Sequence, residues 1–216
     1  MTNLPELYEK YIREYPSLSH VRFALGLHPE LVKDHAKQLP LFLSLLQKAR
    51  YIGEIGLDYS KPKSDADKRL QRQVFEQIID NCKKCGDPKM ISIHSRNAAN
   101  EIIEIIGRYH GQVILHWLSD KNVKLNEAID NGYYFSINNQ MASYQSGQNL
   151  IRKMPLHRLL IESDAPFTKG NIPSYSIGQF VDTAKQMSVI FGFSLDEMIK
   201  TLSDNFRRLL KNERLD

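Results

Sequence analysis

The feature that most constrains the fold is a regular alternation of short apolar runs with helical stretches along the whole chain. The apolar runs typical of buried strands are 21–27, 50–55, 89–93, 112–116, 132–137 and 158–162. The stretches with helical spacing are 4–15, 30–49 with a break expected at Pro40, 66–85, 97–109, 121–130, 145–153, 176–191 and 195–212. Strands that alternate with helices favour parallel βα units and an α/β fold.

Nothing in the sequence divides this alternation into separate units. No linker, low-complexity tract or change of composition interrupts the 216 residues, so we expect a single domain over 1–216. A parallel α/β sheet is either an open, doubly wound sheet or a closed eight-stranded barrel. No glycine-rich phosphate loop follows any of the apolar runs, so a doubly wound nucleotide-binding fold lacks its usual feature.

Composition and charge limit the surroundings of the protein. No apolar run approaches the ~18 residues of a membrane span, and the opening MTNLPELYEKYIREY carries acids and no apolar signal core. We therefore expect a soluble cytoplasmic protein without a membrane partner. Lys and Arg number 29 against 25 Asp and Glu, a net charge of +4, which is compatible with a nucleic-acid partner but does not require one.

Polar residues follow the apolar runs at positions that apolar periodicity does not predict. They are His28, Glu54, His94, His116 and Asp164. In a parallel barrel the carboxyl ends of the strands converge on one mouth, and imidazoles with carboxylates are ligands for Zn, Mn or Mg. Each residue alone also has an ordinary explanation, such as a hydrogen-bonded histidine or an aspartate that begins a turn. Their repeated occurrence at corresponding positions favours a metal site.

Several local phrases also carry a family resemblance. They are Gly26-Leu27-His28-Pro29, Gly53-Glu54-Ile55-Gly56-Leu57-Asp58-Tyr59, Ile93-His94-Ser95-Arg96, His116, and Leu160-Ile161-Glu162-Ser163-Asp164-Ala165-Pro166. In this order, over nearly the whole chain, they resemble the TatD family of metal-dependent deoxyribonucleases. Within the family, Leu-His-Pro-Glu-Leu-Val after Gly26 and the pair His116-Trp117 are most similar to QatD, the TatD-like component of Qat anti-phage systems.

The resemblance implies a TIM-type (β/α) barrel whose mouth holds divalent metal, Mg, Mn or Zn, as one or two ions. By position, Glu54 would bridge two ions, and His94 and His116 would hold the second ion. Asp164 would contact the first ion and the attacking water, while His28 and Arg96 would lie near the scissile phosphate. The implied partners are DNA, single-stranded or at ends, and proteins of a defence system.

One part of the family pattern is missing. Family members begin with a strand that carries Asp-x-His-x-His, and no His-x-His occurs in this sequence. We therefore expect a barrel incomplete at the N-terminus, with about six of the eight strands. Another chain could fill the gap, the sheet could close differently, or the sequence could begin at an internal methionine. Glu54, His94 and His116 would still be able to hold one ion.

A smaller departure concerns the residues after His116. Trp117 could stack on a base at the mouth or pack at the barrel edge, and Asp120 adds an anion that would disfavour a phosphate close by.

Three functions remain open at this point. The first is a metal-dependent deoxyribonuclease. The second is a catalytically weak member that acts as a nucleic-acid-binding or scaffold subunit, and the third is a related metal hydrolase of a small molecule.

Overall fold

The computed structural model describes residues 1–16, 18, 20–60, 64–120, 122–168 and 176–211. Its centre is a five-stranded parallel sheet in which each strand pairs with the next one along the chain. The strands are β1 (Tyr51–Gly56), β2 (Met90–His94), β3 (Gln112–His116), β4 (Tyr134–Ile137) and β5 (Leu159–Ile161). A strand order that never reverses is that of a barrel wall, whereas a doubly wound sheet reverses at its switch point.

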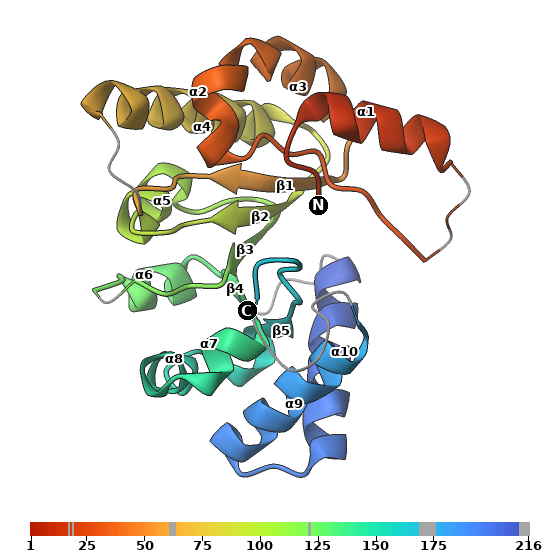
Figure 1. Ribbon diagram of the computed structural model, residues 1–216, viewed down its shortest axis with the longest axis vertical. Helices are drawn as coiled ribbons and strands as arrows, with labels where there is room; N and C mark the ends of the chain where they lie inside the picture. Colours follow the sequence, from red (N-terminus) through yellow and green to blue (C-terminus); the bar gives the residue numbers. More distant parts are fainter. Residues whose placement is uncertain (17, 19, 61–63, 121, 169–175, 212–216) are drawn as a thin grey trace.

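Helices surround this wall (Figure 1). They are α1 (Pro5–Glu14), α2 (Val32–His35), α3 (Leu39–Leu46), α4 (Asp65–Lys84), α5 (Ala99–Ile106), α6 (Leu125–Asp130), α7 (Asn139–Ser143), α8 (Gln145–Ile151), α9 (Gly178–Phe191) and α10 (Leu195–Lys211), with short 3₁₀ turns η1 (Pro29–Leu31), η2 (Ala36–Gln38) and η3 (Leu156–Arg158). Helices α1 to α4 lie beyond β1, and α7 to α10 lie around β5. Residues 121 and 212 of the predicted helices lie outside the described residues.

The prediction of a strand over 21–27 was wrong. This segment makes one isolated parallel bridge, between Leu25 and Ile52. The pairing of β1 shifts between Ile52 and Ile55, and the N–H of Glu54 donates to the carbonyl of Thr2 rather than to the segment beside it. Because the ladder is interrupted there, the segment lies along the edge of β1 without forming a regular strand, and the described sheet has five strands instead of six.

The proline in 30–49 acts as expected. The stretch is divided into short turns, and α3 begins at Leu39 with Pro40 in its first turn, where the missing N–H of proline costs no hydrogen bond.

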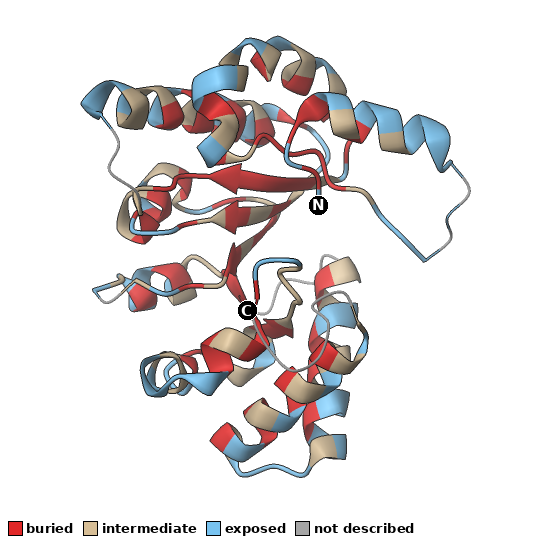
Figure 2. Ribbon diagram, viewed as in Figure 1, coloured by how far each residue is buried: buried red, intermediate tan, exposed pale blue. Residues whose placement is uncertain are grey.

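The buried residues form a large cluster between the sheet and its helices, and a smaller one on the other face of the sheet (Figure 2). The smaller cluster consists of Tyr134, Leu160 and Leu209, with Met90 and Ile114 packed against it. Side chains alternate along a strand, so Met90 and Ile114 share a face with His94 and His116. The end of α10 therefore packs against the face of the sheet that carries the polar strand-end residues.

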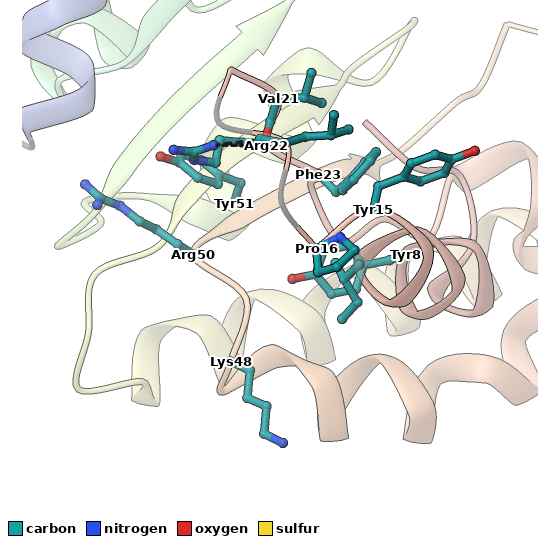
Figure 3. A pocket seen from close by; sticks show the side chains of 11 residues that line it. Tyr8, Tyr15, Pro16, Val21, Arg22, Phe23, Lys48, Arg50 and Tyr51 are labelled. Atoms are coloured by element: carbon teal, nitrogen blue, oxygen red, sulfur yellow. Dashed lines mark hydrogen bonds between the residues drawn. The ribbon is translucent and has the colours of Figure 1, made fainter.

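Two further features complete the fold. None of the described helices is both long and apolar enough to cross a lipid bilayer. A hollow of about 530 Å³ lies beside the start of β1, lined by Tyr8, Tyr15, Phe23 and Tyr51 among others (Figure 3). Because Tyr51 is the first residue of β1, this hollow is at the opposite end of the strands from the polar cluster described next.

Candidate metal centre

The strand ends bring the predicted polar residues to one edge of the sheet. Glu54 lies in the second half of β1, and His94 and His116 are the last residues of β2 and β3. Asp164 follows β5 by three residues, and His28 follows the segment beside β1. Parallel strands carry their carboxyl ends to the same side, which is why positions so far apart in the sequence lie close together.

One carboxylate oxygen, Oε1 of Glu54, is the centre of the cluster. It lies 2.8 Å from Nδ1 of His94, 3.1 Å from Nε2 of His116 and 3.7 Å from Nε2 of His28. The His28 and His94 rings meet edge to face, with centroids 4.8 Å apart. Glu54 is 8% exposed, so the carboxylate and its imidazoles interact with little competition from water.

Two more carboxylates hold the far sides of the imidazoles. Nε2 of His94 lies 2.8 Å from Oδ2 of Asp58, and Nδ1 of His116 lies 3.0 Å from Oε1 of Glu162. Each of these two rings therefore lies between two carboxylates, which fixes its orientation. A carboxylate on the outer nitrogen of a ligating histidine is the usual way in which proteins orient such a ligand.

Asp58 and Glu162 were not predicted as site residues. Asp58 is 1% exposed and accepts hydrogen bonds from the N–H and the hydroxyl of Ser60. Glu162 accepts from the Ser136 hydroxyl and from Nδ2 of Asn138. Both acids lie within phrases that carried the family resemblance, but a partner on the outer side of an imidazole leaves no periodic signal in the sequence.

The charges in the cluster stabilise one another. Burial opposes ionisation of Glu54, but hydrogen bonds from His116 and His94 outweigh it and hold the pKa of this carboxyl well below its usual range. Burial likewise opposes the charged form of His94, yet its contacts with Asp58 and Glu54 raise the pKa of that ring. The negative charge and hydrogen bond of Glu162 overcome burial and raise the pKa of His116 well above its usual value. Without a metal ion, the folded protein therefore favours the protonated forms of His94 and His116.

Asp164 differs from the other carboxylates. Burial raises its pKa to about 6, although the nearby charge of His116 acts in the opposite direction. Its backbone has a left-handed φ of 46°, a conformation that costs of order 1–3 kcal/mol in a non-glycine residue and is concentrated at functional sites. Asn97 and Trp117 also have positive φ, and each lies in a loop that directly follows β2 or β3.

Arg96 and the residues after His116 are less closely joined to the cluster. The carbonyl of Arg96 accepts the N–H of Tyr59, and its side chain is exposed. Trp117 is partly buried and packs against the main core, which favours a packing role. The Asp120 carboxylate accepts the N–H groups of Asn97 at 2.8 Å and Ala99 at 2.9 Å. The Asp120 carboxylate therefore links the loop that follows β3 to the loop and helix start that follow β2.

The donor atoms fit a divalent ion. Ligand atoms of His28, Glu54 and His94 all lie within 4.8 Å of one another, and His116 contacts the same oxygen of Glu54. Imidazole nitrogens with a carboxylate oxygen suit Zn and Mn, and Mg accepts the carboxylate with water. His28, which the family resemblance placed near the phosphate, is grouped by the structure with residues able to hold the ion.

Comparisons with known proteins identify the family of this chain. A family model described as TatD related DNase matches residues 5–211. An uncharacterized metal-dependent hydrolase of Buchnera aphidicola is 28% identical over an alignment that covers 96% of this chain and 81% of that protein. Human deoxyribonuclease TATDN3 is 27% identical over 199 residues, covering 85% of this chain and 70% of that protein.

Solved structures agree on the fold. The crystal structure of the TatD homologue YjjV from Escherichia coli superposes with a TM-score of 0.80 at 19% identity, covering 96% of this chain and 83% of that one. A TatD family hydrolase from Entamoeba histolytica gives a TM-score of 0.71 at 18% identity. These likenesses confirm the expected α/β architecture, an incomplete TIM-type barrel. The protein belongs to the TatD related DNase family of metal-dependent hydrolases.

Proposed function

We propose that this protein is a metal-dependent deoxyribonuclease that hydrolyses phosphodiester bonds of DNA at the cluster around Glu54. The proposal rests chiefly on one observation, the convergence of His28, His94 and His116 on a single buried carboxylate oxygen. DNA is the proposed substrate because the family and the human relative are named for deoxyribonuclease activity. In this proposal Glu54, His94, His116 and Asp164 hold one or two divalent ions.

The chemistry required is the attack of water on a phosphate diester. A divalent ion, when bound, supplies positive charge to the phosphate oxygens and makes the proton of water easier to remove. In this proposal Asp164 takes up that proton, since a positioned carboxylate can act as a general base. Asp58 and Glu162 keep the imidazoles in place, and the exposed cation of Arg96 attracts the phosphate backbone.

The test is cleavage of end-labelled single-stranded DNA in Mg²⁺ or Mn²⁺. Glu54→Gln and His94→Ala should each reduce cleavage by at least 100-fold, on the order of the loss seen when a major catalytic group is removed. Glu104→Gln and His157→Ala are matched controls, because both residues are exposed and lie away from the cluster, and they should cleave like the unmodified protein.

The alternatives predict different results. Intact DNA in both metals, together with salt-sensitive DNA binding that survives Glu54→Gln, would favour a nucleic-acid-binding or scaffold subunit instead. Metal-dependent turnover of small phosphate esters but not of DNA would favour a small-molecule hydrolase.

We also propose that the protein acts in anti-phage defence as a QatD-like component with defence-system partners. The support is the sequence around His28 and the pair His116-Trp117. Phage plating on cells that carry the neighbouring genes should rise about as much with Glu54→Gln as with deletion of this gene. Equal protection with and without the intact cluster would contradict a catalytic role in defence.

A single domain over 1–216 is likewise proposed. It is supported by the main hydrophobic cluster, which includes residues from Leu4 to Leu202. One cooperative unfolding transition, with coincident fluorescence and circular dichroism curves, is the expected result, and two separated transitions would contradict it.

A further inference from the structure

An exposed aromatic residue closes the turn that begins at Asp164. Phe167 is 69% exposed and stands three residues after Asp164. The N–H of Phe167 donates to the carbonyl of Asp164 at 2.9 Å. Such a turn keeps the Cα atoms of its first and last residues within about 7 Å of each other, so the backbone of Phe167 lies close to that of Asp164.

The turn is held firmly on its other side as well. Thr168 is 5% exposed, and its hydroxyl donates to the carbonyl of Ser163 at 2.8 Å and lies 3.3 Å from the side-chain amide of Gln179 in α9. Gln179 is itself 1% exposed. Phe167 is thus exposed although its own N–H is hydrogen-bonded to Asp164 and the next residue, Thr168, is buried and hydrogen-bonded.

The other aromatic residue considered at the mouth does not offer the same surface. Trp117 is partly buried and packed against the main core. A single exposed phenylalanine is common on protein surfaces, so exposure alone says little. Here the exposed ring also belongs to a residue whose backbone N–H is hydrogen-bonded to Asp164.

We propose that Phe167 is a positioning residue that stacks on the nucleobase next to the scissile phosphate. This inference rests on the proposed deoxyribonuclease function. Every base has a flat face, so stacking on an aromatic ring holds a nucleotide without sequence preference. A phosphate and its neighbouring base belong to the same nucleotide, so a ring one turn from Asp164 can contact the base while the phosphate lies at the cluster. Bases inside a duplex are covered by their neighbours, so this contact favours single strands and frayed ends.

The experiment compares Phe167→Ala with the unmodified protein on a single-stranded oligonucleotide and on an abasic oligomer of the same length. Phe167→Ala should raise KM for the normal oligonucleotide by about 5- to 100-fold, the range of one lost base stack. On the abasic oligomer the two proteins should be alike, because the partner of the ring is already missing. Phe167→Trp should restore KM. Phe206→Ala is the matched control, since Phe206 is 53% exposed on α10, and it should change nothing.

Two outcomes would overturn the inference: unchanged KM in Phe167→Ala, or an equal loss on the normal and abasic substrates. Fluorescence anisotropy of a labelled oligonucleotide with metal-free protein separates this inference from the function on which it rests. If the unmodified protein cleaves no DNA, the proposed function fails. Weaker binding by Phe167→Ala but not by Phe206→Ala would still support the stacking contact, and equal binding by all three proteins would refute it.

Discussion

Removal of the Asp120 carboxylate is expected to loosen two loops at once. Its two oxygens accept the N–H groups of Asn97, in the loop between β2 and α5, and of Ala99, the first residue of α5. Asp120 itself belongs to the loop that follows His116 at the end of β3. In Asp120→Ala both N–H groups lose their acceptor, and that of Ala99 belongs to a residue with 0% exposure.

The size of the effect follows from the two hydrogen bonds. A hydrogen bond to a charged group contributes roughly 1.5–3 kcal/mol, and loss of a helix N-cap costs about 0.5–2 kcal/mol. Because Asp120 is partly exposed and water can replace part of the bonding, we expect a loss of about 2–3 kcal/mol in the free energy of unfolding. For a chain of this length that lowers Tm by about 4–12 °C.

The assay is urea unfolding of the metal-free protein followed by fluorescence. Asp80→Ala serves as control, because Asp80 is an exposed acid on α4, and it should change stability by less than about 0.5 kcal/mol. Asp120→Asn should fall between the two, since an amide retains one acceptor oxygen without the charge. A loss below about 0.5 kcal/mol in Asp120→Ala would show that the carboxylate does not hold the loops together.

Two further predictions concern the imidazoles. Glu162→Gln removes the charge that orients His116, so metal affinity measured by calorimetry should fall about 10- to 100-fold. The control variant Glu104→Gln should leave metal affinity unchanged. Equal affinities in the two variants would exclude an orienting role for Glu162. The folded-state pKa values of His94 and His116 lie above the ordinary value of 6.5, so their contribution to the stability of metal-free protein is complete below about pH 6.5 and is lost as the pH rises through the folded values. Chelated protein should therefore melt at a lower temperature at pH 9 than at pH 6.5, and a His94→Asn, His116→Asn variant should show a smaller difference; an unchanged difference would contradict the assignment.

The sequence was most informative where chemistry interrupts periodicity. Glu54, His94 and His116 interrupt apolar runs, and the ends of parallel strands converge, so their meeting could be predicted without coordinates. Asp58 and Glu162 could not be assigned in this way. They contact the imidazoles from the outer side, and that relation depends on how loops turn after the strands.

The strand expected over 21–27 shows a different limit. Its second half is buried, with Leu25 and Leu27 almost inaccessible, whereas Val21 at its start is 47% exposed. Regular pairing depends on the partner, however, and the irregularity of β1 near Glu54 could not be anticipated from the residues of the segment itself. The short helix α7 was missed because five residues are too few for a periodic signal.

The contact between the end of α10 and the start of β1 has a consequence for how the chain is made. Nη2 of Arg50 donates to the carbonyl of Leu210 at 2.8 Å, across 160 positions of sequence. Synthesis proceeds from the N-terminus at about 5–20 residues per second, so Arg50 leaves the ribosome many seconds before its acceptor exists. Tyr134 and Leu160 are likewise synthesised well before Leu209, the residue that packs against them. The inner surface of the sheet thus stays uncovered until α10 has been synthesised, and its final packing is a late step in folding.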